Sequence, residues 1–300
     1  MTQTIYCLSF LLFISGPIHA KVHDFETARL KSTAGSGVGS VLMNEAAILN
    51  PASISFFSFT SIYLQKHDLK LKGSGEANKI TSQYGKKSDG LGVILADGKN
   101  AAKGALSYTI QQEGPYKRKR FSAGLGSMAS KTSAVGAGYR YTVDEDILLP
   151  TEKSKNKYHQ FTMGAMHALG ESLTVGLLYV DPLGKTPEDS RGYVGGQYFL
   201  KRFIALIGDV GADYRRGLSD TLVYRAALQL SFFKDFFVRA GLFDDKAMGE
   251  RGNGIGISWV GPKLNIDVAM KTTKPNGSSV TTGTLAQKTQ ETIFGLSYRF

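Results

Sequence analysis

Apolar and polar residues alternate along most of the chain after residue 54, and this pattern constrains the fold more than any other feature. The C-terminal residues 294–300 read FGLSYRF, with an apolar or aromatic side chain at every second position. The same alternation runs through 135–141, 222–232, 255–259 and 264–271. A period of two predicts β-strands that have one apolar face and one polar face.

Fourteen segments of this kind follow residue 53. We place them at 54–68, 90–97, 103–112, 119–128, 133–142, 157–168, 172–181, 191–200, 203–214, 220–232, 236–244, 252–260, 263–272 and 290–300. Segments of about ten residues recur, which is the length that a tilted strand needs to cross the hydrocarbon core of a membrane. Strands in soluble proteins average about 5–6 residues, so a transmembrane barrel is favoured over a soluble β-sandwich.

The connections between these segments alternate in length. Those after odd-numbered segments are long and polar, and they lie at 69–89, 113–118, 143–156, 182–190, 215–219, 245–251 and 273–289. Most of those after even-numbered segments are tight. Outer-membrane barrels combine short periplasmic turns with longer external loops. We therefore predict an all-β fold, a transmembrane antiparallel β-barrel of about 14 strands over residues 54–300, with twelve or sixteen strands as alternatives. It would lie in the outer membrane of a Gram-negative-type envelope, with both termini periplasmic.

Residues 1–20 predict a signal peptide. The apolar run CLSFLLFIS at 7–15 is followed by Gly16-Pro17, and Ala20 offers a small residue before a cleavage site. An uncleaved anchor is the alternative, but the run is well short of the ~20 residues that span a membrane as a helix. Cleavage would remove Cys7, the one cysteine of the chain, so the mature protein could form no disulfide or cysteine-based metal site.

Residues 21–53 do not alternate, and we predict that they form an N-terminal hatch or plug. The stretch SVLMNEAAIL at 40–49 has helical character and stops at Asn50-Pro51. A residue before proline disfavours the helical conformation, so a short helix should end there. A segment of this kind directly before the first strand is expected to sit inside the barrel mouth.

This stretch resembles the segment before the barrel in FadL-type outer-membrane transporters and in the related PorV- and PorQ-type barrels. In those, a pattern close to G-x-A-x-x-D-x-A-x-x-x-x-N-P-A precedes the first strand. The matching residues are Gly37, Gly39, Asn44, Glu45, Ala46, Ala47, Asn50, Pro51 and Ala52. The resemblance implies a fourteen-stranded barrel with an N-terminal hatch, whose gate would lie at Asn44–Pro51. The chain departs from the family at Ser53, where a glycine is usual, and at Asn44-Glu45, which replaces an acidic pair.

Polar side chains on the face opposite the apolar one should point into the lumen. They are Ser107, Thr109, Arg140, Gln197, Asp209, Asp213, Arg225, Gln229, Arg239, Asn265, Asp267, Lys271 and Arg299. One interpretation is a paired network that fills the interior and braces the hatch, and the other is the lining of a solute pathway. An apolar route would draw on the residues of inward parity Phe203, Ile207, Phe237 and Phe243.

The sequence gives little support to enzymatic or nucleic-acid functions. There is no G-x-S-x-G nucleophile motif, and His159 and His167 lie about one strand length apart, so we predict no enzyme, no cofactor and no metal site. The formal charge is +11, but the basic residues are scattered, which argues against nucleic acid. The one dense run, Lys117-Arg118-Lys119-Arg120, predicts a solvated loop that would contact anionic lipopolysaccharide.

Aromatic residues lie near the ends of the predicted strands, as an interfacial girdle requires. They are Tyr108, Tyr139, Tyr141, Tyr179, Tyr198, Tyr214, Tyr298 and Phe300. The last two, Tyr298 and Phe300, resemble the C-terminal signal that the barrel-assembly machinery reads.

The FadL resemblance implies passive transport of a small hydrophobic or amphipathic solute. The alternative is a plugged, PorV-like barrel that docks a protein partner in secretion or surface attachment. A general porin is a third hypothesis.

Overall fold

The structure is a computed structural model that describes residues 22–72, 88–100, 102–113, 116–146, 154–184, 190–201, 203–276 and 288–300. Its strands are β1 (Thr60–Lys72), β2 (Asp89–Asp97), β3 (Lys103–Glu113), β4 (Tyr116–Met128), β5 (Ser133–Asp146), β6 (Ser154–Leu169), β7 (Leu173–Val180), β8 (Arg191–Leu200), β9 (Ile204–Asp213), β10 (Val223–Phe232), β11 (Phe236–Asp245), β12 (Glu250–Val260), β13 (Leu264–Pro275) and β14 (Lys288–Arg299). Short helices precede β1, namely α2 (Ala28–Ser32), η2 (Asn44–Ala47) and η3 (Pro51–Phe56), and α4 (Leu218–Thr221) follows β9. The predicted signal peptide lies outside the described residues.

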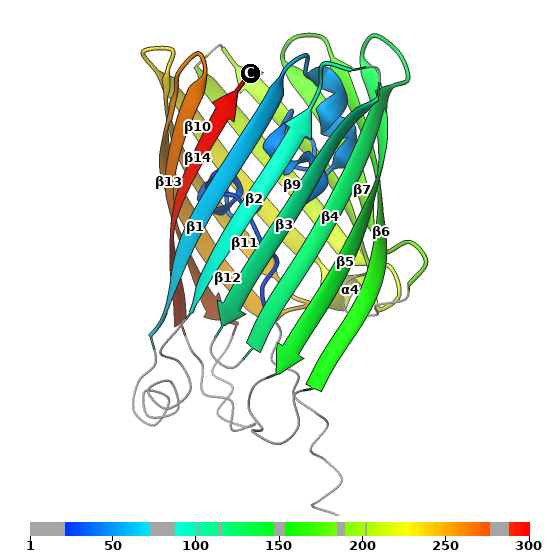
Figure 1. Cartoon of the computed structure of the whole chain (residues 1–300), viewed down its shortest axis with the longest axis vertical. Coiled ribbons are helices and arrows are strands. Elements are labelled where there is room, and N and C mark those ends of the chain that lie inside the picture. The colour runs from blue at the N-terminus through cyan, green and yellow to red at the C-terminus, as the bar shows by residue number, and fades with distance from the viewer. Residues whose placement is uncertain are drawn as a thin grey trace, which may run out of the picture.

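The fourteen strands form one closed antiparallel barrel (Figure 1). Each strand pairs with its neighbours in the sequence, and β1 closes the barrel against β14, with Ser61 opposite Arg299 and Lys72 opposite Lys288. Closure leaves no unpaired sheet edge, which is the condition for strands to span a membrane. The predicted fourteen-stranded antiparallel barrel is confirmed. Among the described residues, no helix has both the length and the hydropathy to cross a bilayer.

The outer face of the barrel is apolar. Along β9, for example, Leu206 is 47 % exposed whereas Ala205 and Ile207 on either side are buried. Outward apolar side chains recur on nearly every strand, among them Leu95, Leu106, Leu125, Val135, Met163, Leu177, Val194, Val210, Leu242, Ile255, Val268 and Phe294. An apolar surface of this extent marks a membrane-contacting face. It explains why alternation is so regular in the sequence.

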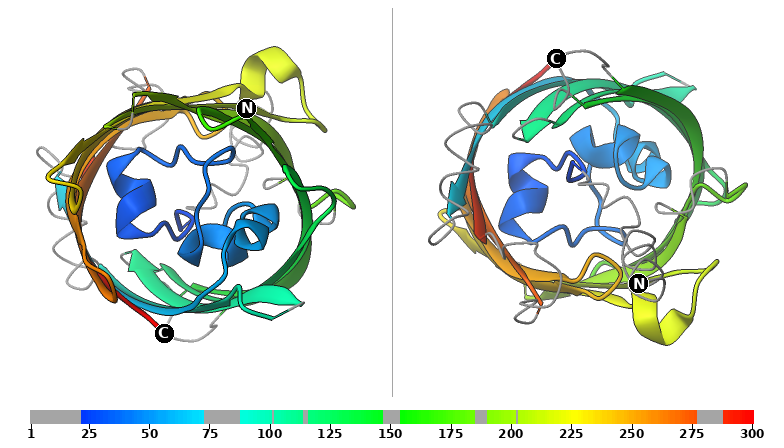
Figure 2. Two further views of the ribbon diagram at one scale, coloured as in Figure 1. Left: turned by 90° about the horizontal axis from the view of Figure 1, so that it is seen from above. Right: turned by 90° about the horizontal axis from the view of Figure 1, so that it is seen from below.

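The segment before β1 lies inside the barrel. Figure 2 shows residues 22–59, in blue, within the ring of strands in both end views. We call residues 22–59 the plug. The sequence boundary at 53/54 was wrong, because Asn50 caps η3 through its side chain and residues 51–56 continue the plug as a helix, so that β1 begins only at Thr60.

The two ends of the barrel differ. The turn end carries the short connections 98–102, 129–132, 170–172, 201–203, 233–235 and 261–263, together with Phe300. The loop end carries the other connections, whose described residues are 88, 181–184, 190, 214–222, 246–249 and 276. The first described residue, Val22, accepts a hydrogen bond from Arg118 near the loop end, and the plug runs from there through the lumen to β1. A periplasmic position of both termini stays a prediction.

One predicted loop is a strand hairpin. The connection between β3 and β4 is residues 114–115, not 113–118, and the basic run Lys117–Arg120 belongs to β4. Arg118 and Arg120 are buried, and both bond plug residue Asp24. Lys119, on the other face, pairs with Glu145 at 3.3 Å. The predicted solvated loop at 117–120 is therefore wrong, whereas contact of this region with lipopolysaccharide stays a prediction.

Candidate functional site

The plug is seated on glycines of the barrel wall. Helix α2 packs against β12 and β13, where a side chain on Gly254 would overlap the carbonyl oxygen of Lys31. A side chain on Gly176 of β7 would likewise overlap the carbonyl oxygen of Val38, and one on Gly136 of β5 the backbone nitrogen of Ala52. These positions let two backbones approach more closely than any other residue allows.

The predicted gate residues hold the plug together and fix it to the wall. The Asn50 side chain accepts a hydrogen bond from the Ala52 backbone N–H at 3.1 Å and donates to the Val38 carbonyl at 2.8 Å. Pro51 lies beside it, against the wall glycine Gly136. Two further gate residues act in η2, where Glu45 accepts from Thr27 Oγ1 at 2.7 Å and Asn44 accepts from Ser61 Oγ at 2.5 Å. Their hydrogen bonds place them as a brace at the core of the plug.

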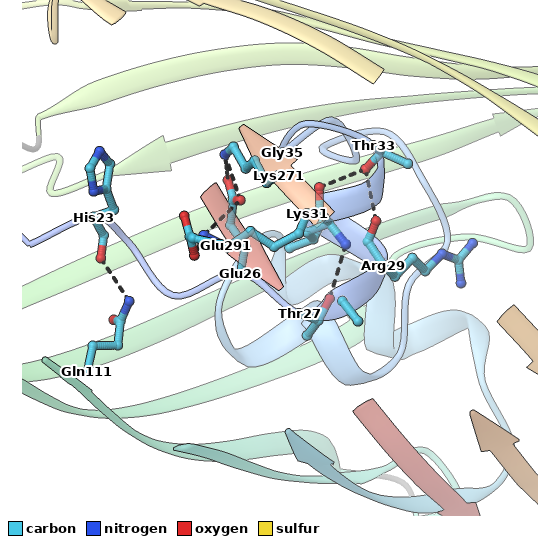
Figure 3. Close-up of polar contacts among 12 residues, drawn as sticks. His23, Glu26, Thr27, Arg29, Lys31, Thr33, Gly35, Gln111, Lys271 and Glu291 are labelled. Carbon is cyan, nitrogen blue, oxygen red and sulfur yellow. Dashed lines mark hydrogen bonds and ion pairs between the residues drawn. The ribbon is translucent and has the colours of Figure 1, made fainter. Parts of the chain in front are cut away.

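Buried ion pairs join the plug to the wall beside a cavity near the loop end (Figure 3). Lys31 Nζ lies 2.5 Å from Glu291 Oε2 on β14, and Lys271 Nζ on β13 lies 2.7 Å from Glu26 Oε2. Burial lowers the pKa of Lys31, but Glu291 and Glu26 outweigh it and raise that pKa to about 12. Burial raises the pKa of Glu26, but Lys271 and Lys31 hold it below its usual value. The plug is therefore fixed by charges on both partners.

The side chain of His23 bridges β3 and β12 near the loop end. Its Nδ1 lies 2.9 Å from Glu113 Oε2 on β3, and its Nε2 lies 3.0 Å from Glu250 Oε2 on β12. Its backbone carbonyl accepts a hydrogen bond from Gln111 at 3.1 Å (Figure 3). The Glu113 carboxylate raises the pKa of His23 well above its usual value, against the opposing effect of burial, and Glu250 adds to the rise. The imidazolium thus ties the plug to two distant strands.

We call the contacts of His23 with Glu113 and Glu250 the clasp, and they predict a pH-dependent contribution to the free energy of unfolding. Because the folded-state pKa of His23 is raised, its stabilisation is complete below about pH 6.5, the unfolded value, and is lost as the pH rises through the folded value. We expect the melting-temperature difference between the protein and a His23→Gln variant to be largest in mildly acidic buffer and to shrink in alkaline buffer. A difference that stays constant over this range would contradict a charged clasp.

The lumen residues predicted from the sequence fall into four groups. Four contact the plug: Asp209 accepts the backbone N–H groups of Gly37 and Val38, Arg225 donates to the Gly35 carbonyl, Arg140 donates to the Ile48 carbonyl and Lys271 pairs with Glu26. Those that gather toward the turn end are Gln229, Arg239, Asn265, Asp267 and Arg299. Asp213 bonds Arg215 and Arg216 and so holds the 214–222 connection, while Ser107, Thr109 and Gln197 are buried on the inner wall.

Two cavities lie on either side of the plug. The loop-end cavity, of about 110 Å³, is lined by charged side chains that include Lys31, Lys271 and Glu291. The turn-end cavity, of about 220 Å³, combines arginines with Phe57, Phe59 and Phe237. Of the residues predicted for an apolar route, Phe237 and Phe243 each line a cavity and Ile207 is buried. Phe203 was wrongly placed, because it lies in a turn and is 50 % exposed.

Several functional residues escaped the sequence analysis. His23 and Glu26 lie in a segment without periodicity, so no spacing placed them, whereas Glu291 shares the inward parity of Ser297 in β14. Arg118 and Arg120 were readable, since they share the inward parity of Ser122 on the same strand. The wall glycines also lie at inward-facing positions among polar residues. A glycine there indicates either that another backbone packs closely against the strand or that the strand is locally weakened, and the alternation alone does not distinguish the two.

Solved channel structures share this fold. The match to a monoaromatic hydrocarbon channel, CymD, covers 91 % of this chain and 97 % of that channel, with a TM-score of 0.71 at 10 % sequence identity. The match to a Pseudomonas putida toluene transporter, TodX, covers 92 % of this chain and 99 % of that transporter, with a TM-score of 0.68 at 11 % identity. The match to a Ralstonia pickettii toluene transporter, TbuX, covers 92 % of this chain and 98 % of that transporter, with a TM-score of 0.67 at 9 % identity. At these identities the similarity shows the fold alone, a closed antiparallel β-barrel with a segment inside it. The sequence matches no protein-family model and no curated protein.

Proposed function

We propose that this protein is an outer-membrane channel for the passive transport of a small hydrophobic or amphipathic solute, with residues 22–59 as its movable plug. The observation that carries the proposal is the position of the plug between two cavities, inside a barrel whose outer face is apolar. The solved structures with this fold are channels and transporters of monoaromatic hydrocarbons, which supports a hydrophobic solute.

In this proposal the turn end and Phe300 face the periplasm and the loop end faces outward. A solute would enter at the loop-end cavity and reach the turn-end cavity when the plug shifts. Asn44, Glu45, Asn50, Pro51 and Ala52 would then set the energy of that shift, because they hold the plug to itself and to the wall. Tyr298 and Phe300 remain the predicted signal for the barrel-assembly machinery.

A filled lumen disfavours a general porin, since the plug occupies the middle of the ring of strands (Figure 2). The docking alternative has no support from the matched structures, which are channels and transporters. The hydrophobic route is thus the function that the geometry favours.

Uptake by intact Gram-negative cells tests the proposal. We expect cells that express the protein to take up labelled toluene several-fold faster than cells with an empty vector, with no change in the uptake of a labelled trisaccharide. The lipopolysaccharide leaflet is the barrier that a hydrophobic solute must bypass. No increase for toluene would contradict the proposal, and an equal increase for the trisaccharide would indicate a general porin.

A further inference from the structure

The turn-end cavity carries more positive than negative side chains. Three arginines from different elements line it, Arg29 of α2, Arg239 of β11 and Arg299 of β14, against two carboxylates, Glu45 and Asp267. An excess of cations around a partly open cavity favours an anion there. The question is which of these charges are already satisfied.

Both carboxylates have partners within the protein. Glu45 accepts from Thr27 at 2.7 Å, and Asp267 accepts from Ser258 and lies 3.7 Å from Arg239. Arg239 itself also donates to Gln229 at 2.7 Å. Each carboxylate is therefore held by a hydroxyl group, and one of the three arginines, Arg239, lies beside Asp267.

The other two arginines have no carboxylate partner among the described residues, and Arg299 donates to the Asn265 amide oxygen at 3.0 Å. Within the described part of the chain, no carboxylate oxygen lies within 4.0 Å of the Arg29 or Arg299 guanidinium. Figure 3 shows the Arg29 side chain turned away from the Lys31–Glu291 cluster, with no contact drawn to its guanidinium. At the loop-end cavity, Lys31, Lys271 and His23 each pair with a carboxylate, and Arg225 donates to the Gly35 carbonyl. At the turn-end cavity, two arginines without a carboxylate of the described chain within 4.0 Å line the same space.

Aromatic rings stand beside these cations. The Arg299 guanidinium carbon lies 5.1 Å from the centre of the Phe59 ring, and that of Arg239 lies 5.5 Å from the centre of Phe237. The cavity measures about 220 Å³. A cavity of roughly 150 Å³ accommodates benzene, so this one has room for a single ring and a small substituent.

We propose that the turn-end cavity binds a small aromatic carboxylate, a monoanion whose carboxylate lies between Arg29 and Arg299 and whose ring lies against Phe59 and Phe237. Guanidinium groups bind carboxylates through charge-assisted, often bidentate hydrogen bonds, and the rings exclude water from them. This proposal rests on the proposed function for its place on a transport route, and it adds that an acidic aromatic solute is held at the exit.

Calorimetric titration of benzoate into the refolded, detergent-solubilised protein tests the proposal. We expect saturable binding that weakens at least about tenfold in an Arg29→Gln/Arg299→Gln variant, because two charge-assisted hydrogen-bond donors are lost. Lys234→Gln is the matched control, since it removes a positive charge at an exposed turn of the same end, and it should bind as the unaltered protein does. Benzyl alcohol, which keeps the ring, and acetate, which keeps the carboxylate, should each bind at least about tenfold more weakly than benzoate.

Three results would overturn the proposal: no saturable benzoate binding, equal affinity in the double arginine variant, or acetate binding as tightly as benzoate. Heat-dependent migration in SDS gels shows that each variant is folded before the titration. Binding is measured without a membrane barrier, so a failure of toluene uptake in cells would count against the proposed transport and leave the benzoate result intact.

Discussion

Trypsin should cleave the plug of a Gly254→Val variant about ten- to a hundredfold faster than that of the unaltered protein. The valine side chain would overlap the Lys31 carbonyl oxygen, so α2 must leave its seat on β12 and β13. Overpacking of this kind typically costs about 1–3 kcal/mol. That free energy raises the population of the displaced plug, and with it the cleavage rate, about ten- to a hundredfold. Lys31 is a trypsin site whose side chain is only 3 % exposed in the seated plug, so cleavage there reports displacement.

Gly208→Val is the matched control for this prediction. Gly208 lies on the outward face of β9, and the nearest atom to an added side chain is 3.7 Å away. We expect its plug to be cleaved at the unaltered rate. If Gly254→Val also left the rate unchanged, the close seating of α2 on the wall would be wrong.

A Glu291→Gln variant should lose about 3–5 kcal/mol of unfolding free energy. The substitution leaves the Lys31 ammonium buried with only Glu26 nearby, at 3.7 Å, and an incompletely compensated buried charge is costly. Urea unfolding of the refolded barrel, followed by tryptophan fluorescence from Trp259, measures the loss. Replacing both partners, as Lys31→Met with Glu291→Leu, should recover most of the stability because no buried charge is then left without a partner.

Glu145→Gln supplies the comparison for an exposed ion pair. Glu145 lies 3.3 Å from Lys119 and 3.5 Å from Lys155, whose side chains are 36 % and 50 % exposed. Exposed pairs contribute about 1 kcal/mol or less. Equal losses for Glu145→Gln and Glu291→Gln would mean that the plug–wall pair is not a buried charge contact.

The barrel could be predicted because lipid faces one side of every strand and the lumen faces the other. Because of that contrast, apolar and polar residues alternate in segments such as 264–271. The prediction failed where the contrast disappears. At 113–118 neither face is apolar, because Arg118 bonds the plug inside while Lys117 and Lys119 lie outside, so a strand hairpin resembles a polar loop. Residues 54–56, which we assigned to the first strand, belong to η3, whose N-terminus the Asn50 side chain caps.

The site was less predictable than the fold. Parity placed Lys271 and Asp209 on the inner face, but not their partners Glu26 and the Gly37–Val38 backbone. Those partners lie far away in the sequence, and their positions depend on the path of the plug through the lumen. A brace and a solute lining also use the same residue types, so only the contacts separate Arg225, which holds Gly35, from Arg299, which has no carboxylate partner among the described residues.

Single-channel conductance tests the central claim, that residues 22–59 close a lumen which would otherwise conduct. The mature chain and a version lacking residues 21–50 would be refolded and inserted into planar bilayers under identical conditions. We predict that the intact protein is nearly silent and that the shortened one opens stable, water-filled channels. If the shortened barrel is folded but as silent as the intact protein, the wall itself is sealed and the plug is not what closes it.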